Sequence, residues 1–117
     1  MSEQTRLNPD QAAAQLRIPC IRLWLLRILE GMPRYSGNDE FMRTALAYAG
    51  LPVARAELLE QLRFLAERKL VTLDHRVEFN IWVVALTGSG QDVALGLVEA
   101  EGIERPQAQT SEVGRDE

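Results

Sequence analysis

The apolar residues of this 117-residue chain change their spacing near residue 70, and this change limits the folds open to it. Before residue 70 they recur every three or four positions, which predicts amphipathic helices. From Val71 they alternate with polar residues, and 81–86 is an apolar, β-branched run, which predicts strands. We therefore expect a mainly α fold with a small β-hairpin (α+β), whose hairpin turns within 76–80.

Two helices are expected before residue 31. Residues 8–10, Asn-Pro-Asp, suit a helix N-terminus, and a short helix is expected over 9 to about 17. Pro19 then ends, kinks or restarts the helix, because proline has no backbone N–H to donate. The next helix reaches about residue 30 and is the most apolar of the chain, so it is expected to form the centre of the core. Its apolar stripe contains Ile21, Leu25, Ile28 and Leu29.

A short break between two further helices predicts a helix-turn-helix. Asn38 is expected to cap the first of them. Its apolar positions at helical spacing are Phe41, Ala45, Tyr48 and Ala49. The break, residues 50–53, has the length of a helix-turn-helix joint. The second helix is expected to bury Leu58, Leu62 and Leu65 on one face.

The glycine-rich stretch Thr87-Gly88-Ser89-Gly90 resembles the start of a phosphate-binding loop but lacks the residues that such a loop needs. A Walker loop needs a lysine after its last glycine, and this chain has no lysine after Lys69. A dinucleotide fingerprint needs a third glycine inside a strand-helix-strand unit, and Val93 stands there instead. We therefore expect a turn in which Thr87 or Ser89 caps a final helix over 92–101.

The composition excludes several classes of protein. One cysteine and one histidine exclude an internal disulfide and a cysteine/histidine metal cluster, and no nucleophile and base stand at a recognisable spacing. We expect no enzyme activity, no cofactor and no metal. No apolar run approaches the length of a membrane span, so a cytoplasmic protein without membrane contact is expected. The net charge of −4 is concentrated after residue 89, which leaves the rest of the chain near neutral.

The predicted order of elements resembles a winged helix-turn-helix. "LLEQLRFLAERKLVTL" followed by a hairpin and "VVALTGSGQDVA" resembles the later part of MarR-, PadR- and ArsR-type domains. "RLWLLRILEGMP" and "ALTGSGQDVALGLVEAEGIERP" are similar to the small winged-helix proteins of Mu-like prophages. The resemblance spans residues 18–106. It implies a winged-helix domain over 9–106, between a flexible N-terminus (1–8) and a disordered acidic tail (107–117).

The resemblance also indicates which residues would contact duplex DNA. The third helix of a winged helix-turn-helix enters the major groove, which selects Arg55 and Arg63 there. Arg43 flanks the start of the preceding helix, and Arg76 lies in the wing, as the loop between the two hairpin strands is called. The third helix also carries Glu57, Glu60 and Glu67, so a face of solvated salt bridges stays an alternative. Ala54 stands where relatives often have a capping Ser or Thr, and Lys69 where they have Gly.

Other side chains carry structural expectations. Trp24 and Trp82 are expected in the core, and His75 in a strand. Phe64 lies off the apolar stripe of its helix, so it either seals the hairpin against that helix or marks an interface. The first and last helices are the expected contacts of a homodimer.

Two functions follow from these observations. The first is a DNA-binding regulator of transcription from a phage or prophage. The second is a winged helix used as a protein-interaction module in phage assembly or DNA packaging. The scarcity of basic residues and the acidic C-terminal segment favour the second function, whereas the order of elements favours the first.

Overall fold

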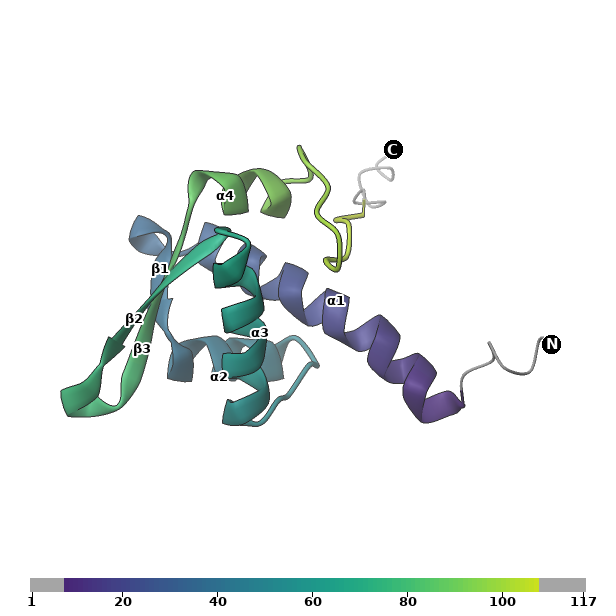
Figure 1. Ribbon diagram of the computed structural model, residues 1–117, viewed down its shortest axis with the longest axis horizontal. Helices are drawn as coiled ribbons and strands as arrows, with labels where there is room; N and C mark the ends of the chain where they lie inside the picture. The colour runs from purple at the N-terminus through teal and green to yellow at the C-terminus, as the bar shows by residue number, and fades with distance from the viewer. Residues whose placement is uncertain (1–7, 108–117) are drawn as a thin grey trace, which may run out of the picture.

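A computed structural model describes residues 8–107 of the chain (Figure 1). Its elements in chain order are α1 (Pro9–Glu30), a 3-10 turn (Pro33–Tyr35), β1 (Ser36–Asn38), α2 (Asp39–Tyr48), α3 (Arg55–Glu67), β2 (Val71–Arg76), a 3-10 turn (Val77–Phe79), β3 (Ile81–Leu86) and α4 (Gly88–Ala94). The helices and the three-stranded antiparallel sheet form an α+β, winged-helix-like fold, as the sequence predicts. The expected flexible N-terminus and acidic tail lie, apart from Asn8 and Gln107, outside the described residues.

One helix replaces the two that the sequence predicts before residue 31. α1 continues through Pro19, so the expected end of a first helix near residue 17 is wrong. A guanidinium N–H of Arg17 donates 2.8 Å to Glu57 of α3, and another donates 2.6 Å to the carbonyl of Pro52. These bonds hold the segment before Pro19 in line, against the cost of an interior proline. In Figure 1 the N-terminal half of α1 extends well beyond the rest of the domain.

The core lies where α1, α2, α3 and the sheet meet. Leu58, Leu62 and Leu65 of α3 are fully buried, as predicted. The central stripe of α1 is largely confirmed, with Leu23 and Leu26 added to it. The buried residues of α1 are Ile21, Leu23, Leu25, Leu26 and Leu29. The helix-turn-helix is also confirmed, because α2 ends at Tyr48 and α3 begins at Arg55.

α2 packs through a face other than the expected one. Its buried residues are Asp39, Met42 and Leu46. Phe41 and Tyr48 lie on the expected apolar face, yet their side chains are 45% and 93% exposed. The predicted face was wrong because α2 is oriented in part by Asp39, whose buried carboxylate has partners, Arg55 and the N–H of Trp82, that apolar spacing cannot reveal.

The sheet contains a strand that the sequence analysis missed. β1 pairs antiparallel with β3, so the strand order is β1-β3-β2. With three residues it is too short to show a period of two. The hairpin of β2 and β3 is confirmed, with its bend at 77–80 and Asn80 in the left-handed region at φ 52°. Lys69, at φ 63°, lies in the left-handed region that favours glycine, the residue that the winged-helix resemblance implies at this position.

The last helix is shorter than expected. Thr87 caps it, since its hydroxyl accepts a hydrogen bond from the N–H of Gly90 at 3.0 Å. α4 ends at Ala94, so the expected helix over 92–101 is wrong. Gly96, at φ 81°, turns the chain back toward α1, where the N–H of Glu104 donates 3.1 Å to the carbonyl of Pro19. Within 8–107 no helix is both long and apolar enough to cross a lipid bilayer.

Candidate nucleic-acid interface

The exposed face of α3 and the β2–β3 hairpin form the candidate interface. α3 buries its leucines against the core and turns Ala56, Glu60 and Arg63 toward solvent. The hairpin extends beside it (Figure 1). Ala54 is the N-cap of α3 and provides no side-chain hydrogen bond to the helix. The expected absence of a capping hydroxyl is therefore confirmed, and the first N–H groups of α3 remain uncapped by that residue.

Arg55 is half-buried and bonded to other parts of the protein. Its Nε donates to Oδ2 of Asp39 at 2.9 Å, and its Nη2 donates to the carbonyl oxygen of Asn80 at 2.8 Å. Asp39 is only 2% exposed and also accepts a 3.0 Å hydrogen bond from the backbone N–H of Trp82. Arg55 thus joins the start of α2, the start of α3 and the wing, and these bonds use two of its five N–H donors.

The environment of Asp39 favours its charged form. Burial alone would raise the pKa of the Asp39 carboxyl, but the hydrogen bonds from Trp82 and Arg55 outweigh burial and lower that pKa. Sequence reasoning did not identify Asp39, because an acid directly after a capping Asn reads as an ordinary helix start. No spacing in the sequence pairs Asp39 with Arg55, because the two residues come together only in the folded chain.

Arg43 and Arg76 also have carboxylate partners. Arg43 lies 3.4 Å from Glu40 one turn earlier on α2, and Arg76 lies 2.8 Å from Asp74 on β2. Both pairs are exposed, so they are screened by solvent and weak. A phosphate group would have to compete with these carboxylates for each arginine.

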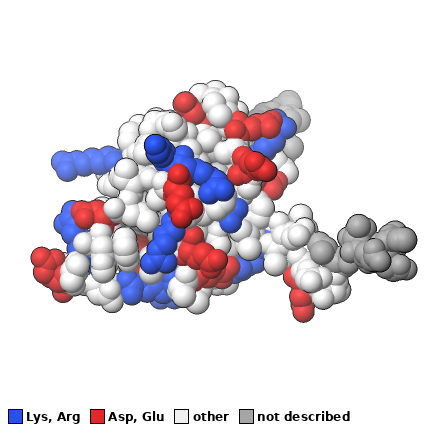
Figure 2. All heavy atoms as spheres, in the orientation of Figure 1, with Lys and Arg blue, Asp and Glu red and all other residues white. Residues whose placement is uncertain are grey.

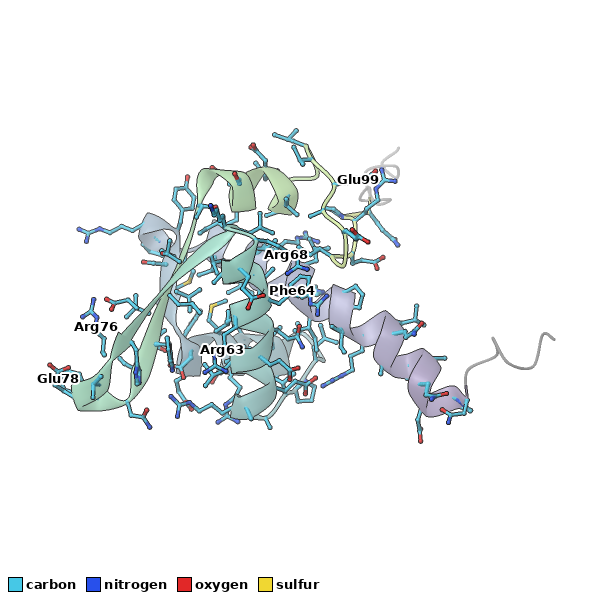
Figure 3. All side chains as sticks on the ribbon, viewed as in Figure 1. Arg63, Phe64, Arg68, Arg76, Glu78 and Glu99 are labelled. Atoms are coloured by element: carbon cyan, nitrogen blue, oxygen red, sulfur yellow. The ribbon has the colours of Figure 1, made fainter. Side chains whose placement is uncertain are left out.

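Arg63 differs from the other three predicted DNA-contact residues. Its guanidinium lies 5.9 Å from the centre of the Trp82 ring, and no described carboxylate forms an ion pair with it. In Figure 3 Arg63 lies between α3 and the hairpin, whereas Arg76 and Glu78 lie on the hairpin's outer part. The structure therefore does not gather the four arginines at one point. Arg55 and Arg63 both lie between α3 and the hairpin, but Arg55 is bonded to Asp39 and Asn80, whereas Arg63 is in none of the ion pairs among the described residues.

Trp82 and His75 form a stacked pair on the hairpin. The two residues are direct cross-strand partners, their ring centres are 4.3 Å apart, and their planes differ by 10°. His75 is a strand residue, as predicted. Trp82 is half-buried and belongs to this stack, so the expected place in the core is wrong for it; Trp24 packs against the core as a partly buried side chain.

The wing tip is apolar rather than basic. Val77 is 72% exposed and Phe79 is 74% exposed, with the acidic Glu78 between them. In the view of Figure 2 basic and acidic side chains alternate over the face of the domain that contains α3 and the hairpin. This face therefore offers a phosphate group individual arginines rather than a continuous basic strip.

Phe64 packs away from the hairpin, under the C-terminal segment. The guanidinium of Arg22 lies 3.4 Å from the centre of its ring and that of Arg68 lies 3.5 Å from it. Arg22 also donates to the buried Gln61 at 2.7 Å and to the carbonyl of Gly102 at 2.9 Å. Burial and the nearby charge of Arg68 lower the pKa of Arg22 from its usual high value. Phe64 thus seals α3 against the C-terminal segment, which neither sequence alternative predicted.

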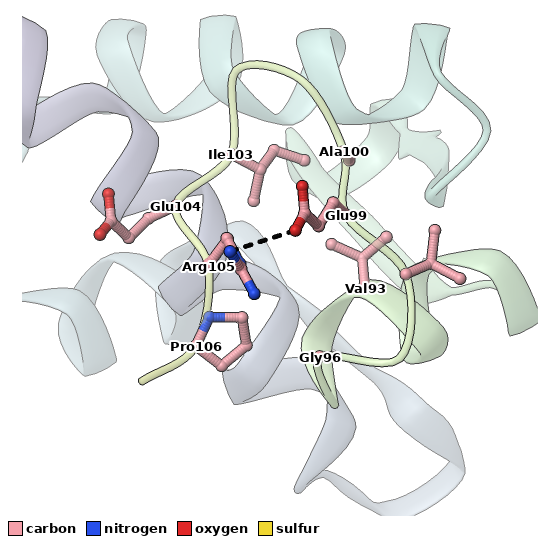
Figure 4. A pocket seen from close by; sticks show the side chains of 9 residues that line it. Val93, Gly96, Glu99, Ala100, Ile103, Glu104, Arg105 and Pro106 are labelled. Carbon is pink, nitrogen blue, oxygen red and sulfur yellow. Dashed lines mark ion pairs between the residues drawn. The ribbon is translucent and has the colours of Figure 1, made fainter. Parts of the chain in front are cut away.

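A small pocket lies between α4 and the returning segment (Figure 4). Its walls include Val93, Gly96 and Ile103, and Arg105 lies 3.2 Å from Glu99 at its rim. The cavity volume is about 40 Å³, which is room for a few water molecules rather than for a cofactor.

The chain is similar to a phage protein. Over 85 residues it is 36% identical to a protein described as "Uncharacterized protein gp26" of Escherichia phage Mu, and the match covers 73% of this chain and 85% of the Mu protein. No family model matches the chain, and no solved structure matches it. The phage part of the predicted resemblance is therefore confirmed: the chain belongs to the family of the phage Mu protein gp26.

Proposed function

We propose that this protein binds duplex DNA through α3 and the β2–β3 hairpin, as a small phage regulator of transcription related to MarR-, PadR- and ArsR-type proteins. The observation that carries the proposal is the placement of Arg63. Its guanidinium stands on the exposed face of α3, beside the wing and 5.9 Å from the centre of the Trp82 ring. Glu60 and Glu67 lie one turn away on the same helix and line the same hollow, but none of the ion pairs among the described residues includes Arg63.

The geometry of α3 supports major-groove docking. Buried leucines fix one side of the helix, and the small side chains of Ala54 and Ala56 leave its N-terminal part open to close approach. A recognition helix contacts base edges with residues of this part, while neighbouring elements contact phosphates. Arg63 lies two turns further along α3, so we propose that it reaches a base edge once the open N-terminal part has entered the groove, while Arg43 and Arg76 contact the phosphate backbone.

The proposal includes a homodimer in the cytoplasm of the host cell. Leu95, Leu97 and Val98 follow α4 and are 52%, 71% and 51% exposed, which supports a second copy covering them. A dimer places two recognition helices on half-sites about one DNA turn apart.

Fluorescence anisotropy with duplex DNA tests the proposal. The probes are a duplex from the region upstream of the protein's own gene and a scrambled duplex, each measured at about 50 and 200 mM salt. We expect the native duplex to bind more tightly than the scrambled one, and both affinities to fall as salt rises. Arg63→Ala is expected to remove the preference between the two.

Arg27→Ala is the matched control for the aromatic contact, because Arg27 of α1 also lies near a tryptophan, 5.4 Å from the ring of Trp24, on a helix outside the proposed DNA-binding face. Since α1 is an expected dimer contact, the variants are compared at equal dimer fraction. Arg27→Ala should bind as the wild type does. Absence of binding to either duplex at the lower salt concentration would contradict the proposal, since a few phosphate contacts suffice for binding there.

A second function, protein interaction in phage assembly or DNA packaging, is favoured by the apolar wing tip and by the paired state of Arg43, Arg55 and Arg76. On this alternative, Phe79→Ser should abolish retention of a phage-encoded partner protein and leave the fold intact. A variant that loses DNA affinity instead would favour the first function.

A further inference from the structure

We propose that His75 and Trp82 are positioning residues that hold Arg63 for readout of a guanine in the DNA major groove. The inference rests on the proposed DNA binding, and it assigns to the hairpin a part in sequence selectivity that a wing contacting only phosphate would lack.

The two rings lie on the side of the hairpin that faces α3. Side chains alternate between the two faces of a strand, so His75 shares a face with Val71, and Trp82 shares a face with Val84. Val71 and Val84 are buried in the core. Beyond these two valines the same face of the hairpin extends past the core. There His75 stacks on Trp82, and Arg63 lies beside the Trp82 ring.

The Trp82 ring is a firm support. The backbone N–H of Trp82 donates a hydrogen bond to the buried carboxylate of Asp39, and the same carboxylate accepts a hydrogen bond from Arg55 at the start of α3. His75 covers the ring at 4.3 Å in a nearly parallel arrangement. The ring is therefore fixed through its backbone and restricted through its stacking partner, so a guanidinium resting near it has a defined place relative to α3.

The aromatic neighbour leaves the donors of Arg63 available. Arg43, Arg55 and Arg76 each spend an N–H on a carboxylate. A guanidinium near a ring is attracted to the π electrons instead, and its N–H groups remain free. Two of these donors match the O6 and N7 acceptors of guanine, the pairing that arginine makes most often with base edges. Prior ordering of the side chain reduces the entropy lost on binding.

Selection from a pool of randomised duplexes provides the test. The wild-type protein should enrich a motif with a guanine at one fixed position in each half-site. Arg63→Lys keeps the charge but not the planar fork, so it should lose the preference for that guanine by about 5- to 150-fold while retaining binding to other sequences. Trp82→Leu and His75→Ala should reduce the preference by about 2- to 5-fold. Trp82→Phe, which keeps a ring, should restore most of it.

A second readout needs no DNA. The order parameter of the Arg63 Nε–H, from nitrogen-15 relaxation in the free protein, should fall in His75→Ala and Trp82→Leu and stay unchanged in Arg27→Ala. His75 is exposed, so its replacement preserves the fold even if Trp82→Leu does not. If the guanine preference survives in both His75→Ala and Trp82→Leu, and the order parameter of the Arg63 Nε–H is unchanged in both, the positioning role is overturned and DNA binding is left intact. A wild-type selection without any enriched motif overturns both.

Discussion

Arg55 and Asp39 form an ion pair of 2.9 Å that joins the first residues of the two helices in the helix-turn-helix. The same arginine donates to the carbonyl of Asn80 in the wing, and the same aspartate accepts from the N–H of Trp82 in β3. α3 and the hairpin therefore have one shared anchor, and this anchor contains a carboxylate, that of Asp39, which is almost completely buried.

This anchor predicts that Arg55 acts in stability. Arg55→Ala leaves the buried carboxylate of Asp39 without its cationic partner, so we expect the free energy of unfolding to fall by about 1–3 kcal/mol. Arg63→Ala should change it by less than about 0.5 kcal/mol, as for an ordinary surface residue. Urea unfolding of the two variants measures the difference. Equal stabilities would show that the ion pair contributes nothing to the fold.

The lowered pKa of Asp39 predicts a pH dependence of stability. A carboxyl whose pKa is lower in the folded than in the unfolded chain stabilises the fold above the unfolded-state pKa, and this contribution disappears as pH falls through the folded-state pKa. Asp39→Asn should therefore be less stable than the wild type at neutral pH, with the gap closing from about pH 5 downward. Urea unfolding at a series of pH values measures the gap. A gap independent of pH would mean that Asp39 titrates alike in both states.

Gly90 and Gly88 offer a matched pair of substitutions at the joint between β3 and α4. A Cβ on Gly90 would overlap the carbonyl oxygen of Leu70 and approach a methyl of Leu86 at 2.7 Å, whereas a Cβ on Gly88 meets nothing within 4 Å. Gly90→Ala should therefore cost about 3 kcal/mol or more. Gly88→Ala should be neutral or stabilise the protein by up to about 1 kcal/mol, as alanine favours a helix. Thermal unfolding compares them, and similar melting temperatures would refute the close approach.

Leu62 and Leu59 test the orientation of α3. Leu62 is fully buried and Leu59 is only partly buried, so Leu62→Ala should lower the free energy of unfolding by about 2–5 kcal/mol and Leu59→Ala by distinctly less. Chemical unfolding monitored by circular dichroism measures both. The reverse order would mean that α3 turns a different face to the core, and with it a different face to solvent.

The elements that the sequence predicted well are those whose evidence is local. The leucines of α3 and the alternation of β2 follow from spacing alone, and Thr87 was one of two expected caps. The failures have nonlocal causes. α1 passes through Pro19, and Arg17 bonds the segment before this proline to Pro52 and Glu57, which lie far along the chain. α2 buries Met42 rather than Phe41, and this orientation depends on how α2 packs against the other helices.

In the candidate site, too, the part with local evidence was predictable from the sequence and the part that depends on distant residues was not. Arg63 was predicted from its place on a helix, and its exposed position agrees with that. The internal role of Arg55 depends on Asp39, Asn80 and Trp82, which come together only in three dimensions, and no spacing in the sequence brings those residues to the same point.

The hydrogen bond from the Glu104 N–H to the Pro19 carbonyl, together with the Arg22 bond to Gly102, has a consequence for synthesis on the ribosome. α1 emerges first, but its partners near residues 102–104 emerge last, so nearly the whole domain must leave the exit tunnel before these contacts form. Until then the apolar stripe of α1 lacks part of its cover. A ribosome stalled before Gly102 should therefore present a nascent chain that chaperones recognise.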